Sequence, residues 1–322
     1  MTKQNFNSKT IVKIALRNGA YILLVLICVI LTVMNPDFLT PVNLINVALQ
    51  SSIMGVLALG MTFVICTGNI DISVGCLIGM CSAAGIALVQ FYSCPWWLSM
   101  LVMFGVGLIF GIVNGLCVAY LKIPSMLVTL ATQCIASGLV LVISNGKSWF
   151  DLPDQYLAIS RNKLFGIPWL LVIVLLMYAV FHFVLGSTVF GRKVLAVGGN
   201  PESAKASGIH TARIILGTYL ISGGVAGIAA ILQTGRLGAF YASMGVGMEM
   251  NVIAAVVIGG TSMTGGRGSI VGTFAGVLLL GIINNALNLL GVGANWQNVA
   301  RGVIILIAVI IDAIRVRFDR ES

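Results

Sequence analysis

The sequence contains very little charge. Only 8% of its 322 residues are Asp, Glu, Lys or Arg, whereas 59% are hydrophobic. A soluble domain carries roughly a quarter charged residues to keep its surface hydrated, so this composition excludes a soluble protein. Because the apolar character extends from about residue 19 to residue 314, we expect nearly the whole chain to be buried in lipid.

Groups that commonly carry catalysis are also scarce. The two histidines, His182 and His210, lack the partners of a zinc-binding helix or of a catalytic nucleophile. Gly146-Lys147 looks like the end of a phosphate-binding loop, but Leu141 stands where that loop requires its first glycine. The seven cysteines are odd in number and lie mostly in apolar stretches, which favours packing over disulfides or metal binding. We therefore expect no enzymatic activity, no metal and no cofactor.

Clusters of charge, Pro and Gly divide the apolar sequence into about ten runs. Most are long enough to cross the roughly 30 Å hydrocarbon core of a bilayer as helices. Glycines spaced four apart, such as Gly107 and Gly111, let helices approach closely in lipid. The sequence thus predicts an all-α polytopic membrane protein, with about ten transmembrane helices in a compact bundle. The runs are 19–34, 45–66, 74–89, 97–120, 126–144, 168–185, 214–232, 251–260, 269–290 and 297–314.

Lysine and arginine are distributed unevenly among the connecting segments. Positively charged segments tend to stay on the cytoplasmic side of a membrane. This rule predicts a cytoplasmic N-terminal segment at 1–18, a transmembrane domain at 19–314 with a long inner loop at 186–213, and a cytoplasmic tail at 315–322. The net charge of +9 then reflects topology and contact with membrane lipid. Because no basic stripe with interleaved aromatic residues is present, we expect no nucleic-acid partner.

The predicted spans contain amides and hydroxyls rather than charges. An ion-coupled secondary carrier often keeps an ionisable residue at mid-depth, and the runs have almost none there. Neutral donors and acceptors suit an uncharged, hydroxylated solute, although hydrogen bonding between helices explains any one of these residues at least as well. The amides that are candidates for a pathway or gate are Asn114, Gln133, Asn284, Asn285 and Asn288.

Two glycine-rich segments interrupt the helical pattern. TGNIDISVG at 67–75 contains Asp71, and GGTSMTGGRGS at 259–269 contains Arg267. Non-helical backbone at membrane depth is tolerated only where protein or a water-filled cavity satisfies it. Asp71 and Arg267 are therefore further gate candidates, and they could pair with each other. Alternatively, Asp71 is the N-cap of the helix that follows.

Motifs along nearly the whole chain resemble, in the same order, those of the ribose-type permeases of bacterial ABC importers. They are GMTFVI at 60–65, the 67–75 segment, GR at 191–192, AVGGN at 196–200, VIAAVVIGGTS at 252–262, GGRG at 265–268 and NNALNLLGV at 284–292. Asn69 departs from the family, which more often has glycine at this position. This departure leaves open the role of its segment and the identity of the solute.

The resemblance implies a permease that works as a pair in the bacterial inner membrane. The pair would consist of two copies of this chain or of this chain and a related one. Its partners would be two cytoplasmic ATP-binding subunits, which carry the ATP chemistry, and a periplasmic sugar-binding protein. The resemblance also assigns coupling to the ATPase to Glu202, Ser203, Ala204 and Gly208 in the inner loop. Ser203 replaces the alanine that is usual in this motif.

The same loop has a local signal that does not depend on the family. Asn200, Pro201 and Glu202 together are typical of a helix start, so we expect a short cytoplasmic helix. An ordinary connecting helix is the alternative to a coupling helix.

The expected function is import of a monosaccharide or sugar-like solute by alternating access, driven by ATP. Two other classes stay open. An ion-coupled secondary carrier of a neutral polar solute would need an ion site at mid-depth. A channel-like or scaffold membrane protein would not need the coupling motif.

Overall fold

The computed structural model describes residues 24–33, 36–150, 152–293, 295–300, 302–304, 306–307 and 310. Helices dominate these residues, and the strands found among them form a single antiparallel hairpin, β1 (Lys163–Leu164) and β2 (Ile167–Pro168). The prediction of an all-α fold is therefore confirmed. The predicted terminal segments at 1–18 and 315–322 lie outside the described residues.

Seven of the helices are long and apolar enough to cross a membrane. They are α2 (Pro41–Cys66), α3 (Val74–Tyr92), α4 (Trp96–Ala119), α5 (Ser125–Ser144), α7 (Trp169–Ser187), α10 (Thr211–Leu237) and α12 (Ile270–Leu289). Two shorter apolar helices, Leu24–Val33 and α11 (Met248–Ile258), fall on the first and eighth predicted runs. The tenth run is described only in part, with helix at the residues seen between 297 and 310. A total of ten spans stays a prediction.

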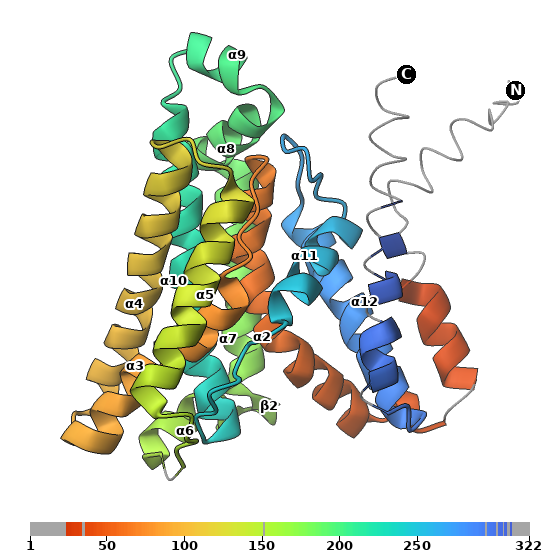
Figure 1. Ribbon diagram of the computed structural model, residues 1–322. Coiled ribbons are helices and arrows are strands. Elements are labelled where there is room, and N and C mark those ends of the chain that lie inside the picture. The colour runs from red at the N-terminus through yellow and green to blue at the C-terminus, as the bar shows by residue number, and fades with distance from the viewer. Residues whose placement is uncertain are drawn as a thin grey trace, which may run out of the picture.

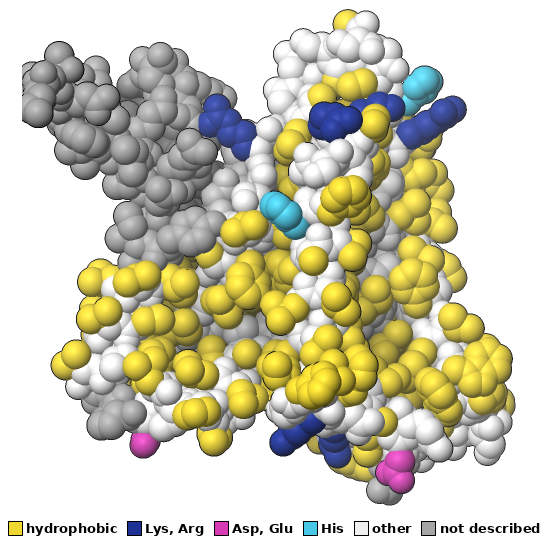
Figure 2. Space-filling model, turned by 180° about the vertical axis from the view of Figure 1, so that it is seen from behind, with side chains coloured by type: hydrophobic (Ala, Val, Ile, Leu, Met, Phe, Trp, Pro, Cys, Tyr) yellow, Lys and Arg dark blue, Asp and Glu magenta, His cyan; other side chains and the backbone are white. Residues whose placement is uncertain are grey.

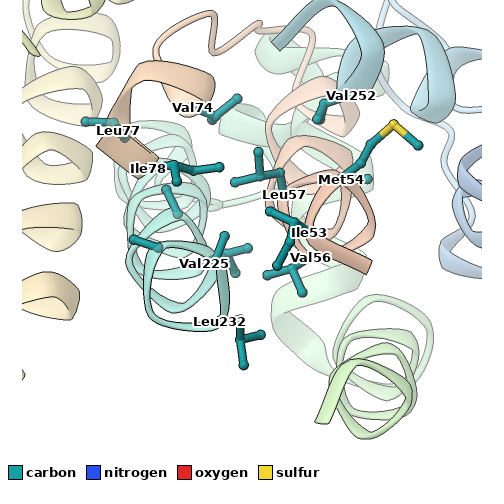
Figure 3. Close-up of a cluster of buried hydrophobic side chains, with 14 of the residues drawn as sticks. Ile53, Met54, Val56, Leu57, Val74, Leu77, Ile78, Val225, Leu232 and Val252 are labelled. Atoms are coloured by element: carbon teal, nitrogen blue, oxygen red, sulfur yellow. The ribbon is translucent and has the colours of Figure 1, made fainter. Parts of the chain in front are cut away.

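Helix α2 lies at the centre of the bundle. Its residues are buried continuously from Ser51 to Cys66, as expected of a helix surrounded by other helices. In Figure 3, Leu57 of α2 lies between Ile78 of α3 and Val252 of α11. Two groups of helices, one containing α3 and α10 and the other α11 and α12, therefore pack on opposite sides of the same central helix.

Glycine contacts hold the long helices close together. A Cβ built on Gly107 of α4 would meet the carbonyl oxygen of Gly223 of α10, and a Cβ on Gly223 would meet that of Gly107. The same relation joins Gly259, after α11, to Gly272 of α12. Side-chain-free contacts of this kind let backbones pack where lipid gives no hydrophobic drive for association. The predicted role of the four-residue glycine spacing in packing is confirmed within the chain.

Short elements cover the two ends of the bundle. At one end, a 3-10 helix η1 (Pro36–Leu39), helix α6 (Asp154–Arg161) and the hairpin connect the long helices. At the other end, α8 (Val189–Gly199) and α9 (Pro201–Ala206) project beyond α4 and α10 (Figure 1). Figure 2 shows hydrophobic side chains over the middle of one face and Lys and Arg side chains towards its two ends. This distribution, with seven spanning helices, is that of a multi-pass membrane protein.

Candidate functional site

The segment 67–73 carries Asp71 into the interior of the bundle. Asp71 is 1% exposed, and its Oδ2 accepts a hydrogen bond of 2.8 Å from the hydroxyl of Ser222. Ser222 lies near the middle of α10, whose 27 residues extend over about 40 Å at 1.5 Å per residue. A non-helical segment therefore places a carboxylate about midway along a spanning helix.

Asp71 is the acceptor at the centre of a buried hydrogen-bond network. Its Oδ1 accepts from the backbone N–H of Ser73 at 3.1 Å and from the Ser73 hydroxyl at 2.5 Å. The amide of Asn114 donates to that hydroxyl at 3.0 Å, and the hydroxyl of Thr132 donates to Asn114 Oδ1 at 2.8 Å. The network thus ties the start of α3 to α4, α5 and α10.

This geometry refines one expectation for Asp71. The N-cap of α3 is Ser73, which has a helical backbone conformation and makes no side-chain capping bond. Asp71 lies two residues earlier and binds the Ser73 N–H from there. Asp71 therefore binds a backbone N–H at the start of α3, as the capping alternative predicted, although the N-cap position itself is Ser73. The described hydrogen bonds of Asp71 go to serines, and a pair between Asp71 and Arg267 stays a prediction.

A second buried acid, Glu249, was missed in the sequence. It is 5% exposed in the first turn of α11, and its Oε1 accepts a 3.3 Å hydrogen bond from Gln133 Nε2 of α5. Among the described residues, none donates a hydrogen bond to Glu249 Oε2. The predicted eighth run began at residue 251, so Glu249 was counted with an outer loop. The expectation that the bundle interior contains almost no charge is wrong at this residue.

The candidate amides fall into three separate places. Asn114 belongs to the Asp71 network and Gln133 binds Glu249. The amides of α12 lie elsewhere: Asn285 exchanges hydrogen bonds of 2.8 and 3.1 Å with Asn43 of α2, and Asn288 Oδ1 accepts from Gln297 at 2.9 Å. For Asn285 the geometry favours the alternative reading, a hydrogen bond between helices. Asn284, the residue before Asn285 on α12, also has an interaction partner in the structure.

Both predicted irregular segments meet the end of α8 through their backbones. Gly266 N donates to the carbonyl of Cys66, the last residue of α2, at 3.0 Å. A Cβ on Gly198 of α8 would meet both Cys66 O and Gly266 N, and a Cβ on Gly265 would meet Gly198 O and Gly68 N. We call these five residues, Cys66, Gly68, Gly198, Gly265 and Gly266, the glycine junction. It connects the 67–75 and 259–269 segments to α8. Gly266, a member of the junction, directly precedes Arg267.

The short helix expected in the loop 186–213 is present. It is α9, and its N-cap Asn200 accepts a 2.9 Å hydrogen bond from the N–H of Ser203. Glu202 and Ser203 are exposed, whereas Ala204 is 4% exposed. Gly208, just past the helix, has φ +78°, a left-handed conformation that favours glycine. The helix is confirmed, and its role in coupling stays a prediction.

Comparison with known proteins identifies the family. Residues 43–309 match the model of the permease component of the branched-chain amino acid transport system. The chain belongs to this permease family. It is 38% identical over 296 residues to the ribose import permease protein RbsC of Bacillus subtilis, covering 91% of this permease and 92% of RbsC. It is 33% identical over 316 residues to RbsC of Haemophilus influenzae, covering 97% and 98% of the two chains.

A further relative concerns another sugar. The permease is 33% identical over 300 residues to the L-arabinose ABC transporter permease protein AraH of Azospirillum brasilense, covering 93% of this chain and 88% of AraH. No solved structure matches the permease. Within the described residues there is no group of three or more His, Cys, Asp or Glu side chains that could hold a metal ion. The described polar groups inside the permease form hydrogen bonds with one another.

Proposed function

We propose that the chain is the membrane-spanning subunit of an ATP-driven ABC importer and moves a monosaccharide or sugar-like solute into the cytoplasm by alternating access. Similarity to ribose and arabinose permeases over most of the chain supports the transporter class and the kind of solute. The structural observation that carries the proposal is the connection of the exposed α9 to both irregular segments through α8 and the glycine junction.

The topology completes this proposal. We place about ten spans in the bacterial inner membrane, with the segment 1–18, the loop 186–213 and the tail 315–322 in the cytoplasm. The positions of the Lys and Arg residues support this orientation. In this orientation α8, α9 and the glycine junction lie on the cytoplasmic side, and α6 with the β-hairpin lies on the periplasmic side.

The partners follow from the same reasoning. Two ATP-binding subunits would contact α9, with Glu202, Ser203, Ala204 and Gly208 as the contact motif. Ala204 is the member of this motif that faces inward, whereas Glu202 and Ser203 are free to meet a partner. A periplasmic sugar-binding protein would dock on the opposite end, and a second copy of this chain or a related permease would complete the pathway.

The mechanism links ATP binding to the Asp71 network. Movement of α9 displaces α8, and the glycine junction passes the displacement to the segment that carries Asp71. Because the network joins four helices, opening it lets them separate. A ligand shifts such an equilibrium only if it binds the two states with different affinity, so nucleotide and solute must each favour one arrangement. In a state in which the network has opened, Asp71 is free to pair with Arg267.

Co-purification tests the proposal. The wild type, a Glu202→Ala/Gly208→Val variant and an Asp154→Ala variant are purified from membranes in mild detergent, and the retained ATPase is identified by mass spectrometry. Asp154 is the matched control, because it is an exposed acid in the first turn of α6 at the opposite end of the molecule. We expect the ATPase with the wild type and with Asp154→Ala only. If no ATPase accompanies the wild type, a secondary carrier becomes the better explanation.

A further inference from the structure

We propose that Glu249 and Gln133 form a binding site for the hydroxyl groups of the transported solute, at the place where α5 approaches the start of α11. This inference rests on the proposed function, since it assigns the solute contact within that pathway. The pair shares no described hydrogen bond with the Asp71 network or with the amides of α12, although it lies next to the network at the start of α3.

The first observation is an unused acceptor. Glu249 is 95% shielded from solvent, and the backbone N–H groups of Gly247 and Glu249 interact with its carboxyl group, yet no described residue makes a hydrogen bond of full geometry to its Oε2. Most buried polar groups in folded proteins have a hydrogen-bond partner, and each exception requires an explanation. Leaving an acceptor unbonded in the interior costs about 1–3 kcal/mol. A solute hydroxyl would supply the missing donor.

The second observation is the tight position of the carboxylate against the backbone of α3. Helix α11 begins inside the bundle, after the non-helical segment 238–247, and Glu249 lies in its first turn. A Cβ built on Gly75 would meet Glu249 Oε2, so the carboxylate fits there only because residue 75 has no side chain. Gly75 itself lies in the first turn of α3, where backbone N–H groups have no partner within the helix. The carboxylate thus lies at the starts of two helices, both of which favour negative charge.

The third observation is that the pair joins two helices at the edge of the core. Gln133 is partly buried on α5, and the next residue, Cys134, is exposed. On α11, Met250 beside Glu249 is 46% exposed. A single side-chain hydrogen bond of 3.3 Å therefore links α5 to α11 beside residues at the outer face of the bundle. Separation of these helices would uncover both polar groups at once.

The chemistry of the pair selects an uncharged, polyhydroxylated solute. A carboxylate accepts from two hydroxyl groups, and the glutamine amide both donates and accepts. A metal ion would need several acidic or imidazole ligands, and no such cluster occurs among the described residues. A role limited to stabilising the start of α11 would use the charge of Glu249 but would require nothing of Gln133.

Cysteine accessibility tests the location without knowledge of the solute. Gln133→Cys is made in a Cys134→Ser background, and the full importer with its ATPase and binding protein is reconstituted in vesicles. A membrane-impermeant methanethiosulfonate is applied with and without ATP and vanadate, and residue 133 is followed by mass spectrometry. We expect modification in one nucleotide state. Ser82→Cys is the matched control, because Ser82 is a fully buried hydroxyl bonded to Thr234. Absence of labelling at residue 133 in every state would overturn the proposal.

Deoxy sugars test the contact itself. Uptake of labelled D-ribose and L-arabinose is compared with uptake of their monodeoxy analogues in the wild type, Glu249→Ala and Ser82→Ala. Discrimination by the binding protein is common to all three and cancels in the ratio. We expect Glu249→Ala to raise the KM at least tenfold and to lose roughly tenfold discrimination against one deoxy analogue, with Ser82→Ala unchanged.

The two proposals fail in different ways. Unchanged discrimination in Glu249→Ala, together with a lowered Tm, would reduce Glu249 to a structural role and leave the importer intact. Uptake by the wild type without ATP would instead overturn the proposal that the chain belongs to an ATP-driven importer. If the wild type takes up neither pentose, the labelling of residue 133 alone decides the location of the site.

Discussion

The backbone of Gly198 lies directly against the carbonyl oxygen of Cys66, so closely that a Cβ at residue 198 would overlap it. Gly198 belongs to α8, and Cys66 is the last residue of the central α2. The contact therefore joins α8, which directly precedes the proposed coupling helix α9, to the helix around which the bundle packs.

Gly198→Ala should impair transport without preventing the ATPase from binding. The added methyl group must push α8 away from α2, because its neighbours are main-chain atoms that cannot rotate aside. We expect uptake to fall more than tenfold while the ATPase still co-purifies. Gly199→Ala is the control, since its Cβ would meet only Gly266 Cα, at an ordinary 3.9 Å. Equal uptake by the two variants would contradict a tight junction.

Asp71→Ala should destabilise the permease strongly. The change removes the acceptor of Ser73 and Ser222 and leaves buried hydroxyls without their partner, at about 1–3 kcal/mol for each unsatisfied group. We expect a clearly lower Tm in detergent by intrinsic fluorescence. Ser222→Ala, which removes only one of the bonds, should lower the Tm less. If both variants had the same Tm as the wild type, a structural role of the network would be contradicted.

Gly107→Ala should loosen the packing of α4 on α10. Its Cβ would overlap the carbonyl oxygen of Gly223, and forcing the helices apart should lower the Tm by several degrees. Gly105→Ala, two residues away on the same helix, meets nothing within 4 Å. It should leave the Tm unchanged or raise it slightly, because alanine favours helix by up to about 1 kcal/mol over glycine. The Tm of each variant is measured by thermal unfolding. A lower Tm for Gly105→Ala, with an unchanged Tm for Gly107→Ala, would contradict this interface.

Reporter fusions should confirm the proposed topology. Alkaline phosphatase is active only in the periplasm, whereas green fluorescent protein fluoresces in the cytoplasm. We expect fusions after residue 322 and within the loop 186–213 to fluoresce without phosphatase activity, and a fusion after Lys163 to give the reverse. A phosphatase-active fusion at residue 322 would require an odd number of spans.

The sequence predicted the long helices well because each is defined by a local property, an apolar run bounded by Pro, Gly or charge. It also predicted α9 from the cap formed by Asn200. It did not predict α6 or the β-hairpin, which lie in a polar segment without a clear period. Contacts between residues far apart in the sequence could not be predicted, because no local pattern specifies them; Asp71 and Ser222, for example, are 151 residues apart. Glu249 had one usable signal, an acid directly before an apolar half-length run and after Gly245 and Gly247.

The short length of α11 affects how well this membrane protein prevents ions from leaking through it. Eleven helical residues extend only about 16 Å, roughly half of the 30 Å hydrocarbon layer. The helix alone therefore does not cross the hydrocarbon layer, and the non-helical segments on either side of it, with buried side chains such as Met244, fill the remaining depth. Because packed side chains rather than a full-length helix close this depth, we expect substitutions that open a cavity there to appear first as proton leak.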